Sequence, residues 1–178
     1  MAKFTNKITK RIQAFIEAQK LFFVATAPKD GRINLSPKGM DSFRVLDEKT
    51  VAWLSVTGSG NETSAHLLEN GKMTIMMCAF EGAPNILRLY GTAIEVLPKD
   101  ENWTDLAVNF PEIPGTRQIF VMTIDSTQSS CGMSIPFYEY KGERNELNDW
   151  AASKTEEELQ TYIQEKNSES IDGLETKK

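Results

Sequence analysis

The chain has 178 residues, of which 40% are hydrophobic and 25% are charged, so it has enough apolar mass for one hydrophobic core. Its net charge of −5, with no block of lysines and arginines, argues against nucleic acid and anionic membranes as partners. No apolar run reaches the length of a membrane span and the first residues lack the apolar centre of a signal peptide, so we expect a cytoplasmic protein that binds a small molecule or another protein.

The first third of the chain predicts an amphipathic helix followed by strands. Apolar residues recur at helical spacing within residues 5–20, with charged residues on the other face. The apolar runs 21–27 and 33–39 flank the sequence PKDGR, whose Asp-Gly pair is typical of a hairpin turn, so they predict two paired strands. Two further strands are predicted at 43–46 and 50–56, and the second is β-branched and aromatic, like a central strand.

A short helix is predicted next, with Asn61 as its N-cap and Gly71 just after its end. Two more runs joined by a loop with Gly and Pro predict a second hairpin, and a Pro followed by acidic residues predicts another short helix. The predicted elements in this part of the chain are strands at 72–80, 85–97 and 117–125, a helix within 98–110, and helical spacing over 143–167.

Six or so strands joined mostly by hairpins predict a mainly β fold with flanking helices, built as an antiparallel barrel and not as an alternating βαβ sheet. We expect a single domain over residues 1–166, including a helical C-terminal extension, and a disordered tail over residues 167–178. Cys78 and Cys131 lie far apart without metal-ligand spacing, so we expect free thiols and no metal site.

The stretch VTGSGNETSAHLLENG, residues 56–71, is the first candidate binding site. Glycines let a backbone approach a ligand closely, and the first N–H groups of a helix have no partners within it, so a phosphate there would meet several donors. Thr63 and Ser64 would add hydroxyl donors, whereas Glu62 would repel a phosphate unless it points outward. The alternative is an ordinary Gly-rich turn with an Asn cap, in which Ser and Thr only satisfy the helix end.

The second candidate is NLSPKGM, residues 34–40, at the end of a predicted strand. Lys38 offers an ammonium group to a phosphate or an electron-rich heterocycle, and Gly39 permits close approach. The alternative is a solvated lysine in a turn.

Arg88 is the third candidate, because it lies among apolar residues in NILRLYG and would be costly to bury unpaired. Alternation places Arg88 on the opposite strand face from Leu87 and Leu89. It is therefore either a ligand contact or an outward-facing charge.

Three motifs occur in an order that resembles the pyridoxamine 5′-phosphate oxidase-like flavoproteins over roughly residues 8–125: INLSPKG, TVAWLSVTGSGNETSAHLLENGKMTIMM and ILRLYGTAIEV. The resemblance implies a six-stranded antiparallel split β-barrel of the FMN-binding type, and a homodimer with FMN at its interface. It places the phosphate near residues 61–64 and the ring along residues 34–40 and the strand that ends at 57. The cofactor-binding residues that it implies are Ser36, Lys38, Gly39, Met40, Ser55, Val56, Thr57, Asn61, Glu62, Thr63, Ser64 and Arg88.

The chain departs from the oxidases themselves at two places. NETS stands where the oxidases carry an Arg-Lys pair at the helix start, and the chain lacks their Arg-rich C-terminal segment for dimerisation and substrate binding. We therefore expect a relative of the oxidases with a different activity.

The resemblance implies an FMN-dependent oxidoreductase acting on a small-molecule substrate, in which the flavin supplies the hydride or electron chemistry. The alternative is a non-catalytic flavin or haem binding or sensing protein on the same barrel, and a third hypothesis is an interaction protein that uses the aromatic C-terminal region. No catalytic acid or base is assigned, because the only histidine, His66, has no recognisable partner in the sequence and is interpreted as a surface or capping residue.

Overall fold

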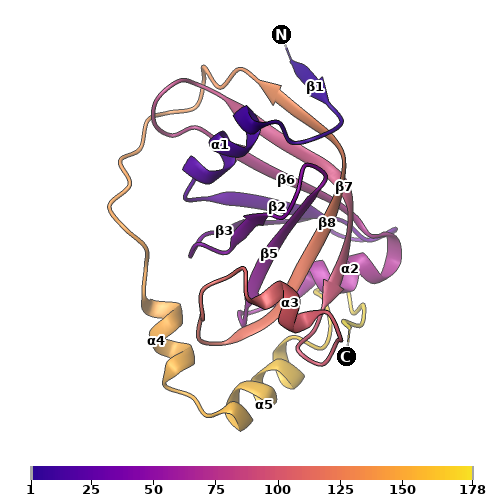
Figure 1. Ribbon diagram of the computed structural model, residues 1–178. Coiled ribbons are helices and arrows are strands. Elements are labelled where there is room, and N and C mark those ends of the chain that lie inside the picture. The colour runs from indigo at the N-terminus through magenta and orange to yellow at the C-terminus, as the bar shows by residue number, and fades with distance from the viewer. Residues whose placement is uncertain (1, 178) are drawn as a thin grey trace.

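A computed structural model describes residues 2–177, in which one antiparallel β-sheet is flanked by helices (Figure 1). The strands are β1 (Lys3–Thr5), β2 (Phe22–Thr26), β3 (Asn34–Lys38), β4 (Phe43–Val45), β5 (Thr50–Val56), β6 (Lys72–Cys78), β7 (Ile86–Val96) and β8 (Thr116–Ser130). The helices are α1 (Lys10–Ala18), α2 (Glu62–Asn70), α3 (Trp103–Ala107), α4 (Glu146–Ala152) and α5 (Glu156–Lys166). None of the helices within residues 2–177 is both long and apolar enough to cross a membrane.

The strand order in the sheet is β3-β2-β6-β7-β8-β5-β4, with β1 added against β8. Both predicted hairpins are confirmed, because β2 pairs with β3 and β6 pairs with β7. The mainly β architecture with flanking helices is also confirmed. The sheet has eight strands, where six or so were predicted. The three-residue β4 matches the strand predicted at 43–46, whereas β1, which no sequence pattern indicated, adds a strand against β8.

The sheet curls into a half-barrel, so that side chains from the two ends of the strand order meet. Phe22 of β2 contacts Phe43 of β4 with 5.0 Å between ring centroids. Lys38 at the end of β3 places its Nζ 5.3 Å from the ring centroid of Trp53 in β5. Because β3 and β4 are the ends of the hydrogen-bonded order, these side-chain contacts close the curl.

The hydrophobic core fills the inside of the curl, and α1 packs against it. Trp53 and Phe120 are buried and stack with 4.5 Å between centroids. Ile16 of α1 is buried in the same core, as its helical spacing predicts. Thr9 caps α1, since its side chain accepts a hydrogen bond from the Ile12 N–H, so the helix begins later than its apolar pattern suggests.

The predicted helical run over 143–167 is divided into α4 and α5. Thr155 and Glu158 form a reciprocal capping box, in which each side chain bonds the other residue's backbone N–H, and this starts a new helix. Figure 1 shows the chain running along the outside of the molecule from β8 to α4 and α5 and ending beside α2.

Residues 167–177 pack onto the domain, which differs from the disorder expected for this tail. Asn167, Ser170 and Thr176 are buried. The Lys177 N–H donates to Ser64 Oγ at 3.0 Å. Side-chain and backbone hydrogen bonds hold this segment on the domain. The expectation of disorder rested on composition, which reports apolar content and net charge and does not reveal such hydrogen bonds.

Candidate functional site

A cavity of about 290 Å³ lies where β3, β5, β8 and the loop before α2 meet. Along β3 the side chains of Asn34, Ser36 and Lys38 face the cavity, while Leu35 and Pro37 between them are exposed, as strand alternation requires. The structure brings together these of the predicted site residues: Ser36, Lys38, Ser55, Val56, Asn61, Glu62 and Thr63. The other lining residues within the two candidate stretches are Asn34, Gly58, Ser59 and Gly60, and Trp53 lies on the strand expected along the ring. Arg117 and Phe120 were not predicted.

The loop at 58–61 presents an uncapped helix start to this cavity. Asn61 occupies the N-cap position of α2 and Gly71 ends the helix in the left-handed conformation, as predicted. However, the Asn61 side chain makes no bond to the helix start and instead pairs with the Gln118 carboxamide through two hydrogen bonds of 2.6 and 3.3 Å. The Ser64 N–H donates to the Asn61 carbonyl at 3.1 Å, whereas the N–H groups of Glu62 and Thr63 have no acceptor within residues 2–177. Two donors at the helix start are thus left for another acceptor, an arrangement that favours an anion.

Arg117 of β8 is the main functional candidate that sequence reasoning missed. Its side chain is buried, with Nη1 donating to the Gly60 carbonyl at 3.3 Å and to the Asn167 side chain, and Nη2 donating to Ser55 Oγ at 3.4 Å. Burial lowers the pKa of Arg117 to about 10, an effect that the negative charge of Glu95 partly opposes. A guanidinium group therefore stands beside the Gly-rich loop.

A signal for Arg117 was present in the sequence. It opens the apolar run RQIFVMTID, and an arginine in such a strand is costly to bury unpaired, the argument that was applied to Arg88. What local sequence could not reveal is that β8 lies next to β5, which places Arg117 beside the loop before α2.

Lys38 is not the solvated turn lysine of the alternative interpretation. Its ammonium group lies over the Trp53 ring and lines the cavity. Burial, and secondarily the positive charge of Arg117, lower the pKa of Lys38 to about 8. Within residues 2–177 neither Lys38 nor Arg117 forms an ion pair, so the two positive charges at the cavity have no carboxylate in direct contact.

Three buried polar groups at the cavity have no hydrogen-bond partner in the described part of the chain. They are Ser36 Oγ, Trp53 Nε1 and Arg117 Nε. Leaving a buried donor unsatisfied costs about 1–3 kcal/mol, and folded proteins seldom do so. Three such groups around one cavity, together with two cations, indicate a negatively charged ligand that is rich in acceptors.

Glu62 lines the same cavity, but the C-terminal tail engages its carboxylate. Both carboxylate oxygens accept from the Ile171 N–H, at 3.0 and 3.1 Å.

His66, interpreted from the sequence as a surface or capping residue, is in fact buried, with its Nδ1 3.0 Å from Thr26 Oγ1. The prediction for His66 is wrong because α2 packs this side of the helix onto β2.

Two predicted hydroxyl residues point away from the cavity. Thr57 is buried and donates to the Gly115 carbonyl at 2.9 Å. Ser64 is fully buried on the far side of α2 and donates to Glu95 Oε2 at 2.6 Å. Within one chain these hydroxyls fasten the loop and helix that frame the site.

Gly39 and Met40 also lie outside the cavity lining. They form a turn after β3 in which Met40 adopts φ 65°, a left-handed conformation that is uncommon for a residue with a side chain. The Met40 N–H donates to Glu143 Oε2 at 3.2 Å, so the segment after β8 holds this turn.

Arg88 lies on the outer face of the sheet. Leu87 and Leu89 are buried in the core, so Arg88 between them points the opposite way, and its Nη1 donates to Ser130 Oγ at 3.4 Å. Within a single chain Arg88 therefore corresponds to the outward-facing alternative.

Residues 2–177 contain no cluster of three or more His, Cys, Asp or Glu side chains that could hold a metal ion.

Comparison with known proteins gives a consistent result. The family model described as pyridoxamine 5′-phosphate oxidase matches residues 8–131. The pyridoxamine 5′-phosphate oxidase family protein ustO of Aspergillus flavus is 35% identical, and the alignment covers 98% of this chain and 77% of that protein.

Solved structures of similar fold include HupZ of Group A Streptococcus, with a TM-score of 0.53, 24% identity, and coverage of 66% of this chain and 89% of that chain. Another is the FAD binding protein of Mycobacterium smegmatis, with a TM-score of 0.51, 15% identity, and coverage of 72% and 97%. At these identities the structural likeness establishes the shared fold.

Proposed function

The chain belongs to the pyridoxamine 5′-phosphate oxidase family, and from this premise we propose that it is a flavoprotein that holds FMN in the cavity beside α2. The observation that carries the proposal is the set of unpartnered buried groups at that cavity, Ser36 Oγ, Trp53 Nε1 and Arg117 Nε. FMN offers a phosphate, ribityl hydroxyls and ring carbonyls as partners for them. The flavin bound by the Mycobacterium smegmatis neighbour, according to its description, supports this class of cofactor.

The residues at the helix start fit a phosphate group. The uncapped N–H groups of α2, the Thr63 hydroxyl and the Arg117 guanidinium are all donors, and two of these sources carry positive charge or a positive dipole end. The oxidases are expected to use an Arg-Lys pair here, and this chain has NETS instead. Arg117 reaches the same loop from β8, so the positive charge missing from the helix start is supplied by a neighbouring strand.

The rest of the lining fits the cofactor's polar ring. Lys38 would hold a positive charge near it, and Ser36 and Trp53 would donate hydrogen bonds to its acceptors. When bound, FMN supplies hydride or electron transfer. We propose an oxidoreductase on a small-molecule substrate, in which these side chains bind the cofactor and exclude water.

A second candidate function is a non-catalytic flavin-binding or sensing protein. It is favoured by the small number of groups at the cavity that could act as acid or base. The Glu62 carboxylate is bonded to the tail, and Lys38 is the one lining residue whose pKa is shifted close to neutral pH. The described lining offers no His, Cys or Met as an axial ligand, which favours flavin over haem.

The visible absorbance spectrum of the purified protein, before and after incubation with FMN or FAD, tests the cofactor. We expect flavin absorbance near one equivalent, and a protein that stays colourless with both flavins would contradict the proposal. Stopped-flow reduction by a nicotinamide donor and reoxidation by oxygen separate the two candidate functions, since an unreactive bound flavin favours the second.

Arg117→Gln tests the assignment of the cavity. Loss of a charge-assisted hydrogen bond is expected to weaken FMN binding by about tenfold to a hundredfold, measured by quenching of flavin fluorescence. Arg117→Lys should recover part of the affinity, because it keeps the charge. Arg44→Gln, at a half-buried arginine of β4 outside the cavity, is the matched control and should bind FMN normally.

We also propose a homodimer with the cofactor at its interface. Large apolar side chains are exposed next to the cavity strand β3 and in the segment after β8: Ile33 (77% exposed), Leu35 (63%), Met133 (83%) and Phe137 (81%). Light scattering after size-exclusion chromatography should give twice the chain mass, and Phe137→Ser should shift the equilibrium toward the monomer. A monomeric wild-type protein would contradict this part of the proposal.

Cytoplasmic location stays a prediction, which cell fractionation tests.

A further inference from the structure

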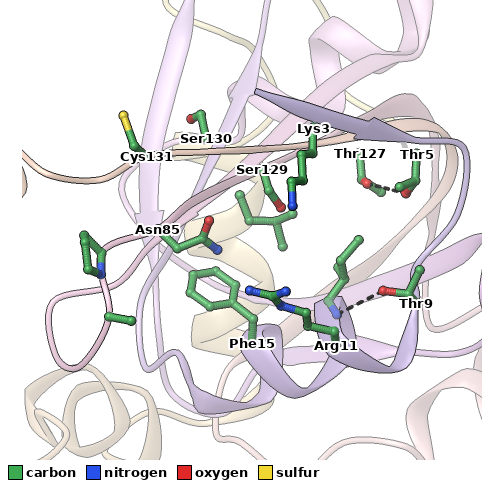
Figure 2. A pocket seen from close by; sticks show the side chains of 14 residues that line it. Lys3, Thr5, Thr9, Arg11, Phe15, Asn85, Thr127, Ser129, Ser130 and Cys131 are labelled. Carbon is green, nitrogen blue, oxygen red and sulfur yellow. Dashed lines mark hydrogen bonds between the residues drawn. The ribbon is translucent and has the colours of Figure 1, made fainter. Parts of the chain in front are cut away.

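A second cavity, of about 440 Å³, lies between α1 and the ends of β1 and β8 (Figure 2). It shares no lining residue with the cavity proposed for FMN. The register of the sheet explains how it forms, since Lys3 and Thr5 of β1 pair with Ser129 and Thr127 of β8 and lie on the sheet face that α1 covers. The proposed function makes no use of this cavity.

Its charge is positive although the chain as a whole carries −5. Figure 2 shows the Lys3 ammonium and the Arg11 guanidinium directed toward the same space. Neither cation forms an ion pair or a side-chain hydrogen bond with residues 2–177, and no Asp or Glu is among the lining residues. An anion in this cavity would meet two cations and no fixed negative charge.

Neutral donors surround the two cations. Ser129, Ser130 and the Asn85 carboxamide line the cavity, and Figure 2 shows Asn85 on the side opposite Arg11. Thr5 and Thr127 are also lining residues, but their hydroxyls bond each other at 2.8 Å. The Ser130 hydroxyl is also engaged, because its Oγ accepts a hydrogen bond from Arg88 at 3.4 Å. Ser129 and Asn85 are therefore the neutral groups that would bond an oxyanion.

The remaining surface of the cavity is apolar. Leu87 is buried beneath it, and Ile12 and Phe15 of α1 and Pro84 form its sides. An inorganic anion would contact the cations and leave this apolar surface in water. A ligand that combines an anionic group with an apolar body would use both parts.

We propose that this cavity binds a small organic anion, in which a carboxylate or phosphate group lies between Lys3 and Arg11 and an apolar body lies against Phe15 and Leu87. The volume is within the range of small-molecule sites in proteins. Because both cations are exposed, the attraction is screened by salt, and affinity is expected to fall as ionic strength rises.

Isothermal titration calorimetry of the purified, flavin-loaded protein with three probes tests the chemistry. We expect 4-phenylbutyrate to bind, and expect 4-phenylbutylamine, which has the same body with a positive charge, and inorganic phosphate, which lacks the body, to bind at least about tenfold more weakly. Phenyl phosphate in a fourth titration decides between carboxylate and phosphate as the preferred anionic group. Equal binding of the amine, or absence of 4-phenylbutyrate binding at 10 mM, overturns the proposal.

Variants locate the site. Lys3→Gln and Arg11→Gln should each weaken the binding of 4-phenylbutyrate by about threefold, and the double variant should weaken it by about tenfold. Lys10→Gln, at a neighbouring lysine that does not line the cavity, should have no effect. Unchanged affinity in the double variant would overturn the proposal.

Discussion

Lys38 and Arg117 carry like charges in one cavity. Burial disfavours the charged form of each side chain and so lowers the pKa of both groups. Such an arrangement is unfavourable in an isolated chain and becomes favourable when an anion lies between the two groups. This unfavourable free energy is consistent with a binding site, since strongly shifted pKa values occur where a protein binds or transforms a ligand.

The pKa of Lys38 leads to a prediction about pH. Without ligand Lys38 is protonated below about pH 8 and loses its proton above it, whereas a hydrogen bond from its ammonium group to an acceptor of the bound flavin ring raises this pKa. Binding then takes up a proton above pH 8, so FMN affinity should fall by about fivefold between pH 7 and pH 9. Fluorescence titrations at several pH values measure this fall.

Lys38→Met should bind FMN more weakly at pH 7 and show a flat profile over the same range. Lys72→Met, at an exposed lysine of β6, should keep the wild-type profile. If the affinity of the wild-type protein for FMN does not change between pH 7 and pH 9, bound FMN does not raise the pKa of Lys38, and the prediction is wrong.

At the scale of elements, the long pairing of β7 with β8 depends on a bulge. The register shifts between Tyr90 and Gly91, so that Tyr90 pairs with Ser126 and Gly91 with Ile124. At this point the backbone of β8 approaches so closely that a Cβ on Gly91 would lie 1.9 Å from the Thr123 carbonyl oxygen. Only glycine fits without moving one of the two strands.

Gly91→Ala should therefore destabilise the domain by about 3 kcal/mol, because the strands must separate at the bulge. The midpoint of urea unfolding, with circular dichroism as the signal, measures the change. Gly58→Ala is the matched control, since a Cβ there meets nothing within 4 Å, and its effect should stay within about 0.5 kcal/mol. Equal midpoints for the two variants would refute the explanation.

At the scale of the whole molecule, the C-terminal tail connects the last helix to the proposed cofactor site. The Asn167 side chain accepts from Arg117 and donates to the Gly58 carbonyl at 3.0 Å, and the Ile171 N–H binds Glu62. The tail thus touches both the arginine and the loop that line the cavity.

Asn167→Ala should lower both stability, by about 1–3 kcal/mol, and FMN affinity, by about tenfold, because Arg117 loses a buried partner. Urea unfolding and FMN titration measure the two effects. Ile171→Ala, at a tail side chain that is 69% exposed, should change neither. If Asn167→Ala lowers stability and leaves FMN affinity unchanged, the tail supports the fold without positioning the site.

The sequence by itself determined the local elements and the face that each presents. Both hairpins, and α2 with Asn61 and Gly71 at its ends, follow from periodicity and turn chemistry, which act over a few residues. The chemistry of the Pro-Lys-Gly turn singled out Lys38, and the family resemblance added Ser36. The family resemblance supplied the cofactor hypothesis, because it records which motifs occur together.

The tertiary structure alone decided which distant residues share the cavity. Arg117 lies beside the loop at 58–61 because β8 pairs with β5, and Asn167 reaches it because the tail folds back. Arg88 and Ser64 are outside the cavity lining for the same kind of reason, since strand pairing and helix packing fix the direction of each side chain. Contacts between residues far apart in sequence depend on how the whole sheet curls, and no local pattern encodes that curl.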